Sequence, residues 1–351
     1  MKFSIPKSIA ERFSRDIGID LGTANTLVYL KGKGIVITEP SVVAVNQKTG
    51  QVVAVGREAK DMLGRTPAHI VAVRPLVEGV ISDFEVTEEM LSYLIQKAQG
   101  ERMPLGPRVV IGVPSGITNV EIRAVRDAAR NAGARDVFII EEPMAAALGA
   151  RLPVEAPVGT MLIDIGGGTT DIALMSLGGI VRAKNVRTAG DVMNQDIASY
   201  IRSEFKILIG DRTAEDVKIA VGSVLKLPAP LTTTIRGRDL VTGLPREIVI
   251  TDADVREAIA SSVSSIIESV KEVIESAPPE VVADVMRHGI YVTGGGALLR
   301  GLPELLAQEL KVPIHVVDDP LTTVVRGTGI VLEDISAYEH ILVQDDEGSI
   351  P

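Results

Sequence analysis

The sequence predicts an α/β fold made of two duplicated lobes, and two observations lead to it. Apolar strand-like runs alternate with amphipathic helical stretches along almost the whole 351-residue chain, an order typical of α/β layers. A short strand–turn–strand pattern also occurs twice, near the N-terminus and near the middle of the chain. Because 46% of the residues are hydrophobic, the chain can bury a core in each of two domains.

The repeated pattern reads IGIDLGTANTLVYL from Ile17 to Leu30 and MLIDIGGGTTDIAL from Met161 to Leu174. Each copy predicts a strand, a tight turn and a second strand. The two copies align at four positions: Asp20 with Asp164, Gly22 with Gly166, Asn25 with Thr169 and Thr26 with Thr170. Two copies about half a chain apart indicate duplicated domains that face each other across a cleft.

Helical spacing, caps and glycine or proline stops predict the remaining elements. They are, in order, a helix over 118–133, a strand running into a helix over 137–150, helices over 213–225 and 252–276, and a strand, glycine turn and helix over 288–310. Thr118 and Glu121 form a capping box, and Gly133 stops that helix. Pro143 suits a first helical turn, and the prolines at 278–279 are expected to end the helix before them.

Composition excludes several classes of function. A formal net charge of −10 argues against nucleic-acid binding through a global positive field. The chain has no cysteine, which excludes disulfides and thiolate metal sites and fits a reducing compartment. Its four histidines lack the spacing of metal ligands, and no apolar run approaches the roughly 18 residues of a membrane-spanning helix.

The N-terminus is not a secretory signal, because Pro6, Glu11 and Arg12 interrupt its apolar residues. Those apolar residues stand among lysines and arginines and are Phe3, Ile5, Ile9 and Phe13. The pattern fits a short basic amphipathic helix and a frayed tail equally well.

The glycines of the two predicted turns point to phosphate binding. Glycine lets another group come close to the main chain, and successive exposed N–H groups form a concavity that binds anions. Small hydroxyl donors accompany them, at Thr23, Thr26, Thr169 and Thr170. Asp20 and Asp164 would repel phosphate directly, so we expect them to hold a hydrated Mg²⁺ that bridges to phosphate oxygens.

One such turn alone would more simply be a plain glycine hairpin, but two matched copies favour a clamp on the β- and γ-phosphates of a nucleotide. Neither turn opens a helix, which excludes the dinucleotide-binding fingerprint, and the chain lacks the Gly-Lys-Ser/Thr of a P-loop. A third cluster, Gly294 to Gly296, can pack an adenine against bare backbone. Glu215 and Lys218 share one helical face, where they can bind a ribose or form a plain surface salt bridge.

Four motifs together resemble the five-part ATPase signature of the actin, sugar-kinase and heat-shock-chaperone superfamily: DLGTANT, EEPMAAA, DIGGGTTD and VTGGGALLRGL. Longer stretches are similar to the MreB family of bacterial actin homologues, among them DLGTANTLVYLKGKGIVITEPSVVAV and EEPMAAALGARLPVEAPVGTMLIDIGGGTTDIALMSLGGIV. The resemblance runs from about Arg15 to Leu332.

The resemblance implies an actin-like ATPase fold with two α/β lobes around a nucleotide cleft and a small insert in each. The implied parts are a lobe I core at 1–43, 77–156 and 328–351 with an insert at 44–76, and a lobe II core at 157–192 and 257–327 with an insert at 193–256.

It also implies a site for ATP or ADP with Mg²⁺. Asp20 and Asp164 would organise the metal mostly through water; Gly22, Thr23, Ala24, Asn25, Gly166, Gly167, Gly168 and Thr169 would bind phosphates; Glu215 and Lys218 would hold the ribose; and Gly294, Gly295, Gly296 and Ala297 would line the adenine side. Glu142 would orient the attacking water, with help from Thr169. Without the resemblance, the simpler interpretation of Glu142 is a carboxylate at a helix N-terminus, where the helix dipole favours a negative charge.

The resemblance further implies ATP-dependent polymerisation with slow hydrolysis. The implied filaments are paired and antiparallel, lie at the inner face of the cell membrane, and guide cell-wall elongation to maintain rod shape. Partners such as RodZ and MreC are implied, and nucleic acid is not. With the resemblance, membrane contact is favoured for Phe3, Ile5, Ile9 and Phe13 and for the loop GERMPLGPR, whose Met103 and Leu105 lie beside Arg102 and Arg108.

Four residues depart from the family pattern. A glutamate is usual where this chain has Asp171 and common where it has Ala220, and acidic residues are common where it has Val192 and Asn194. They bear on hydrolysis and the cleft, and a divergent paralogue remains an alternative. A small-molecule kinase or another ATPase of the same fold is the second alternative. A kinase would need a catalytic aspartate and a larger insert, and a peptide-binding chaperone would need a substrate domain after the ATPase part.

Overall fold

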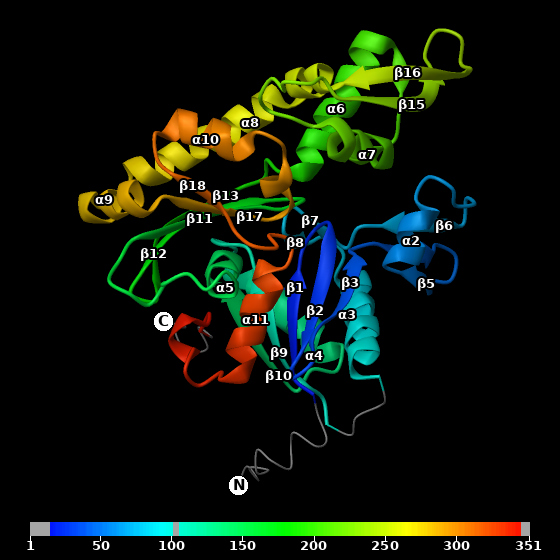
Figure 1. Cartoon of the computed structure of the whole chain (residues 1–351). Helices are drawn as coiled ribbons and strands as arrows, with labels where there is room; N and C mark the ends of the chain where they lie inside the picture. The colour runs from blue at the N-terminus through cyan, green and yellow to red at the C-terminus, as the bar shows by residue number, and fades with distance from the viewer. Residues whose placement is uncertain (1–14, 101–104, 345–351) are drawn as a thin grey trace. The chain divides into compact units, whose positions relative to one another are not determined.

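The computed structural model describes residues 15–100 and 105–344, which form two compact units (Figure 1). Unit 1 takes the described chain up to Ala156, then Leu177–Gly179, and the chain from Thr322 onward. Unit 2 takes Pro157–Ser176 and Ile180–Leu321. The chain returns from unit 2 to unit 1 between Leu321 and Thr322, just before the helix that starts at Thr323. The sequence predicted the corresponding boundary between lobe II and lobe I at 327/328. The four-part subdivision with two inserts stays a prediction.

The central sheet of unit 1 has five strands in the order β10-β9-β1-β2-β3. Their bounds are β1 (Ile17–Leu21), β2 (Asn25–Leu30), β3 (Gly34–Pro40), β9 (Arg108–Val113) and β10 (Asp136–Glu141). β1 and β2 form the predicted antiparallel hairpin, and β9 and β10 run parallel to β1. The C-terminal ends of these three parallel strands therefore meet at one edge, where ligands of α/β sheets commonly bind.

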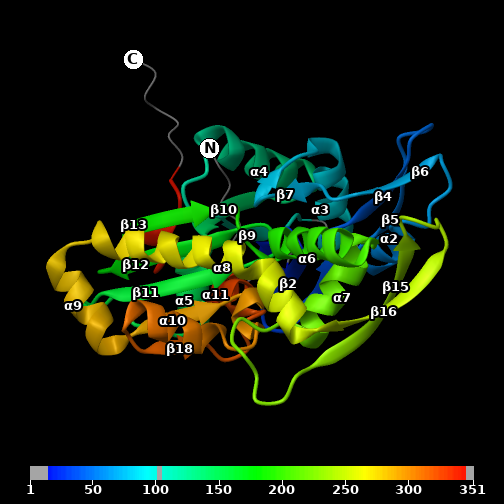
Figure 2. The ribbon, with the colours of Figure 1, turned by 90° about the horizontal axis from the view of Figure 1, so that it is seen from above.

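Two pairs of helices pack on this sheet: α3 (Phe84–Gln99) with α4 (Asn119–Asn131), and α5 (Glu142–Gly149) with α11 (Thr323–Glu333). The pairs lie on opposite faces (Figure 2). α4 begins with the predicted capping box of Thr118 and Glu121, and α5 carries Pro143 in its first turn, as predicted. The remaining elements of unit 1 are short: β4 (Val43–Asn46), β5 (Val52–Val55), α2 (Arg57–Met62), β6 (Ile70–Val73), β7 (Leu76–Val77), β8 (Val80–Ile81) and the 3₁₀ turn η2 (Glu339–Ile341).

Glycines let α5 and α11 cross with their backbones in contact. A Cβ added to Gly149 would overlap the carbonyl of Thr323, and one added to Gly327 would overlap the carbonyl of Ala145. α5 directly follows β10 and begins with Glu142, so this crossing fixes Glu142 against the sheet.

The central sheet of unit 2 repeats that of unit 1, with the order β13-β12-β11-β17-β18. The strands are β11 (Thr160–Ile165), β12 (Thr170–Ser176), β13 (Gly179–Val186), β17 (Ile290–Thr293) and β18 (Ile314–Val316). Again the first two form an antiparallel hairpin and the last two run parallel to the first. The duplication predicted from the two sequence motifs is therefore confirmed in the topology.

Unit 2 also contains α6 (Gly190–Phe205), α7 (Asp211–Val221), α8 (Asp252–Glu275), α9 (Pro279–His288), the 3₁₀ turn η1 (Gly295–Leu298) and α10 (Leu302–Leu310). A smaller sheet is formed by β14 (Ile207–Leu208), β15 (Thr232–Asp239) and β16 (Pro245–Thr251). The prolines at 278–279 follow the end of α8 as expected, but they also begin α9, which was not predicted. Proline suits that place because the first helical N–H groups need no intrahelical partner.

Each unit has its own large apolar core. In unit 1 it lies between the sheet and α3 and α4, and it includes Ile19, Leu91 and Ile111. In unit 2 it fills the space between the central sheet, the small sheet and α6–α10, and it includes Ile163, Ile259 and Leu306.

Candidate functional site

The turn of the β1–β2 hairpin is fixed by the residue that follows β3. Ser41 Oγ donates to the carbonyl of Gly22 (2.5 Å), and Ser41 N donates to the carbonyl of Ala24 (3.0 Å). Gly22 has no room for a side chain, because a Cβ there would lie 2.6 Å from the carbonyl oxygen of Asn25. The predicted phosphate residues of unit 1 therefore form one rigid turn at the C-terminal end of β1.

Thr23 is buried within this turn, and its hydroxyl has a fixed acceptor role. The backbone N–H of Gly79 donates to Thr23 Oγ1 (3.0 Å). A hydroxyl that accepts one hydrogen bond still has a proton to donate, so Thr23 can serve as the small donor that the sequence predicted.

Asp20 and Glu142 are both neighbours of Gly112. The β1–β9 register pairs Asp20 with Gly112, and a Cβ added to Gly112 would lie 3.4 Å from Glu142 Cγ. Burial raises the pKa of Asp20 to about 7, because the charged carboxylate is poorly solvated there. Placing a cation beside such a group restores the charged form, so Asp20 has the character of a metal ligand. Unit 1 thus brings together three parts of the predicted site: the expected metal ligand Asp20, the turn expected to bind phosphate, and Glu142, which is expected to orient the water.

The turn of the β11–β12 hairpin rests on the start of α6. Gly166 N donates to the carbonyl of Thr169 (2.9 Å), which closes the turn. Gly190 N then donates to the carbonyl of Gly166 (3.2 Å), and Asp191 N to that of Gly167 (2.8 Å). Because its carbonyls are bound from behind, the turn of unit 2 has a fixed orientation.

Lys218 supports this arrangement from α7. Its Nζ donates to the carbonyl of Gly190 (2.7 Å). A Cβ added to Gly190 would lie 3.2 Å from this Nζ, so there is little space for a side chain. Burial lowers the pKa of Lys218, and the carboxylates of Glu215 and Asp191 act in the opposite direction. The sequence assigned Lys218 to the ribose; in the structure the contact of its ammonium is with the residue behind the phosphate turn.

The third glycine cluster lies beside Asp164. The parallel β11–β17 register pairs Asp164 with Thr293, and the next residue, Gly294, adopts a φ of +78°. A Cβ on Gly294 would overlap Asp164 Oδ1, and one on Gly296 would overlap Ile165. Only glycine allows this approach, so the predicted adenine residues and the predicted metal ligand form one continuous surface in unit 2.

Two of the residues that depart from the family pattern are buried near this surface. Asp171 stands opposite Asp164 in the β11–β12 register, and Asn185 Nδ2 donates to Asp171 Oδ2 (2.8 Å). Asn194 is buried on α6, one helical turn after Gly190. Both residues are therefore buried in elements that adjoin the predicted phosphate turn, Asp171 on β12 and Asn194 on α6.

The sequence missed three residues that build the site: Ser41, Gly112 and Gly190. Gly190 had a signal, because a glycine at the first position of an amphipathic helix is typical of close backbone contact. Ser41 and Gly112 had none, since each acts through a neighbour that is distant in sequence.

The predicted membrane residues Phe3, Ile5, Ile9, Phe13 and Met103, with Arg102, lie outside the described residues. Leu105 is half-buried just before β9. Arg108 was expected to flank an exposed loop, but it forms an ion pair with Asp16, with Arg108 Nη2 2.5 Å from Asp16 Oδ2. In the part of the chain that the structure describes, no helix is long and apolar enough to cross a membrane, and no three or more acidic or histidine residues cluster as in a protein-only metal site.

Comparison with known proteins decides the family. A family model described as MreB/Mbl protein matches residues 14–340. The chain belongs to the MreB/Mbl family. It is 50% identical over 323 residues to the cell shape-determining protein Mbl of Bacillus subtilis, covering 92% of this chain and 97% of that protein. It is 47% identical over 337 residues to the cell shape-determining protein MreB of Escherichia coli K12, covering 95% and 97%.

Solved structures of MreB and related proteins share the fold of this MreB/Mbl chain. MreB 5 of Spiroplasma citri bound to AMPPNP superposes with a TM-score of 0.89 at 41% identity, over 93% of this chain and 98% of that one. A MamK double helical filament superposes with a TM-score of 0.79 at 24% identity, over 92% and 99%. The predicted actin-like fold is therefore confirmed.

Proposed function

We propose that this MreB/Mbl chain is an ATP-binding, slowly ATP-hydrolysing cytoskeletal protein that polymerises into filaments and helps to determine cell shape. The observation that carries the proposal is the paired hairpin: each unit presents an aspartate and a glycine turn at the same position of the same sheet topology. Relatives named as cell shape-determining proteins, and an MreB solved with AMPPNP and with ADP, support it.

The residues take the roles that their surroundings allow. Mg²⁺, when bound, would neutralise phosphate charge, and Asp20 and Asp164 would hold it mostly through water. The turns at Gly22–Asn25 and Gly166–Thr169 would bind phosphate oxygens through backbone N–H groups. Glu215 and Lys218 would lie toward the ribose and Gly294–Ala297 toward the adenine. Glu142 and Thr169 would orient the attacking water.

MamK, a protein of the same fold, was solved as a double helical filament, which supports self-association as part of the proposal. For this chain we propose paired antiparallel protofilaments at the inner face of the cell membrane, with wall-elongation proteins such as RodZ and MreC as partners. The proposal leads to one measurement: sedimentation at micromolar protein. We expect pelleting with Mg-ATP and much less without nucleotide. ADP release that depends on an added sugar, with no pelleting, would instead indicate a small-molecule kinase.

Glu142→Ala tests the chemical role of the site. The variant should bind ATP like the unmodified chain but release phosphate about a hundredfold more slowly, because the attacking water loses its oriented acceptor while the phosphate turns stay intact. Single-turnover phosphate release and fluorescent-nucleotide titration measure the two effects. Phosphate release at the unmodified rate would mean that another group positions the water.

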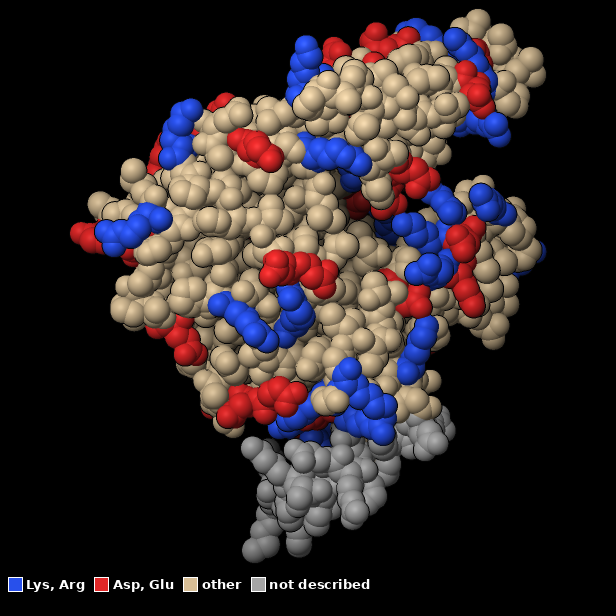
Figure 3. All heavy atoms as spheres, viewed as in Figure 1, with Lys and Arg blue, Asp and Glu red and all other residues tan. Residues whose placement is uncertain are grey.

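One edge of unit 1 supports the membrane part of the proposal. β1, β9 and β10 begin at this edge, so Arg15, Arg108 and Arg135 lie near one another, and Lys33 follows the end of β2 there. Arg135 N donates to the carbonyl of Pro107 (2.8 Å), which joins the segment before β10 to the segment before β9. Lysine and arginine side chains gather at this end of the face seen in Figure 3. Arg108 is paired with Asp16 and Arg135 with Asp136, so Arg15 and Lys33 are the residues of this edge that we propose to face an anionic lipid surface.

A further inference from the structure

The turn between β15 and β16 exposes an apolar tip that the proposed nucleotide site does not use. We call residues 240–244 the hairpin tip. Val241 is 83% exposed and Leu244 65% exposed, and Leu240 is also on the surface. Figure 1 shows this turn projecting beyond the ends of β15 and β16. Apolar side chains that are exposed singly are common on protein surfaces, whereas several exposed together indicate an interaction surface.

The hairpin tip is rigid, because one buried carboxylate organises it. Asp239 Oδ1 accepts hydrogen bonds from Val241 N (2.8 Å) and Thr242 N (2.9 Å), and Asp239 Oδ2 accepts one from Arg246 Nη1 (3.2 Å). Asp239 N donates to the carbonyl of Leu244 (2.9 Å) and so closes the turn. A pre-ordered loop loses little conformational entropy when it binds, which favours a docking role.

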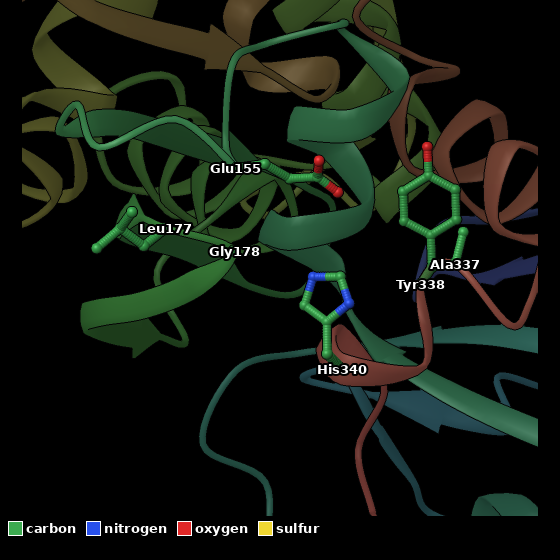
Figure 4. A pocket seen from close by; sticks show the side chains of 6 residues that line it. All are labelled: Glu155, Leu177, Gly178, Ala337, Tyr338 and His340. Atoms are coloured by element: carbon green, nitrogen blue, oxygen red, sulfur yellow. The ribbon is translucent and has the colours of Figure 1, made fainter.

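Unit 1 contains a pocket of about 430 Å³ lined by both apolar and polar side chains, which we call the tip pocket. Three segments line it: the chain after α5, the β12–β13 turn and the chain after α11, with the residues Glu155, Leu177, Gly178, Ala337, Tyr338 and His340. Figure 4 shows the Glu155 carboxylate, the Tyr338 ring and the His340 ring around one space, although Glu155 is far from the other two in the sequence. The volume suits a few side chains of a partner.

The walls of the tip pocket are held in place by the backbone. Leu177 N donates to the carbonyl of Ala156 (3.1 Å), and Gly178 N to that of Val154 (2.8 Å). The His340 ring packs over Gly178, where a Cβ would lie 3.1 Å from His340 Nε2. Leu177 adopts a φ of +53° and is 70% exposed. A leucine that is both strained and exposed contributes little to packing, so its position suggests a binding role.

We infer that the hairpin tip of one copy of this chain docks into the tip pocket of a second copy. Val241 and Leu244 would pack against Leu177 and Ala337. Tyr338 and His340 can donate hydrogen bonds to carbonyls of the turn. Glu155 would face Arg238, which is exposed near the end of β15, just before the hairpin tip.

Because the two surfaces differ, this contact is heterologous, and repeating it joins copies head to tail; it gives a filament where the repeated rotation does not close into a ring. The inference rests on the proposed function as a polymer and names one contact between its subunits. The alternative is that the hairpin tip inserts into a lipid surface, and the experiments below distinguish this from docking on a second copy.

The absence of cysteine from the sequence allows a direct test by cross-linking. Val241→Cys and Ala337→Cys chains, one of them carrying a size tag, are mixed with Mg-ATP under pelleting conditions and treated with a short bismaleimide. We expect a cross-linked dimer that contains one chain of each kind, and a ladder of higher multimers from the doubly substituted chain. Val249→Cys, exposed on β16 away from the tip, replaces Val241→Cys as the control and should give no mixed dimer above background.

A second variant measures the same contact without cross-linking. Val241→Asp with Leu244→Asp should raise the protein concentration needed for pelleting about tenfold or more and leave nucleotide binding unchanged, since both residues lie outside the proposed nucleotide site. If the cysteine chains pellet normally but form no mixed dimer, the inference is wrong while the proposed polymer stands. If the aspartate variant pellets normally but loses binding to phosphatidylglycerol vesicles, the tip contacts lipid and the inference is again wrong. If the unmodified chain never pellets with ATP, the proposed function itself fails.

Discussion

At the scale of single residues, the candidate site is built at positions where a side chain cannot fit. A Cβ on Gly22 would come within 2.6 Å of the Asn25 carbonyl, and Cβ atoms on Gly294 and Gly296 would overlap the end of β11. Backbone therefore lies where an ordinary strand would place side chains. Charged groups surround this bare backbone: Asp20, whose pKa burial raises to about 7, and Lys218, whose pKa burial lowers.

Lys218→Met tests whether this lysine positions the phosphate turn. Its ammonium donates to Gly190, which in turn donates to Gly166, so loss of the ammonium should loosen the turn. We expect ATP affinity to fall about tenfold to a hundredfold, as for the loss of one hydrogen bond to a charged group. Titration with inorganic triphosphate discriminates between the roles, because it has no ribose. Weakened triphosphate binding indicates positioning of the turn, whereas unchanged binding indicates a ribose contact only. Lys226→Met, at an exposed position, should leave both affinities unchanged.

At the scale of elements, the site depends on how closely α5 approaches α11. Glu142 occupies the first turn of α5, and Gly149 ends that helix. Because Gly149 and Gly327 have no side chains, the two backbones touch, and α5 is fixed on the sheet edge that also carries Asp20.

Gly327→Ala should separate these helices. The added methyl group overlaps the Ala145 carbonyl, and backbone cannot move aside as a flexible side chain can. We expect a loss of about 2 kcal/mol or more in the free energy of unfolding, measured by urea titration. Gly210→Ala is the matched control, because no heavy atom lies within 4 Å of its added Cβ and its φ of −92° suits alanine. Equal stability of the two variants would contradict this account of the crossing.

At the scale of the whole molecule, duplication places the same hairpin at the same position of two sheets. Each unit has its own core, so each hairpin is supported independently. The basic residues proposed to face lipid lie at the edge of unit 1 where its parallel strands begin, opposite the proposed nucleotide-binding turn.

Reversing charge at that edge should weaken membrane binding. Arg15→Glu with Lys33→Glu is expected to lower the partition onto vesicles containing phosphatidylserine by about tenfold or more, since a basic residue near such a surface contributes about 1 kcal/mol. The effect should shrink at high salt. The control is Lys48→Glu with Arg65→Glu, an equal change of charge at exposed positions elsewhere in unit 1. If both double variants bind vesicles alike, the basic edge has no part in membrane contact.

The sequence by itself determined the features that depend on local pattern. The two hairpins, the capping box of α4, the proline at the start of α5 and the length of α8 all follow from periodicity, caps and stops that adjacent residues carry. The internal repeat predicted two lobes, because equal motifs fold into equal hairpins. The residue types at the turns likewise predicted which segments would build the site.

Only the tertiary structure decided the contacts between segments that are distant in the chain. Ser41 on the Gly22 turn, Lys218 on Gly190, and Gly112 beside Asp20 and Glu142 have no local signature, because each depends on strand order and helix packing. The ion pair of Arg108 with Asp16 arises in the same way from the parallel pairing of β1 and β9. Local pattern determines which helix or strand forms, because it acts over a few neighbouring residues. The partner of each side chain is determined only when the helices and strands pack around the core of each unit.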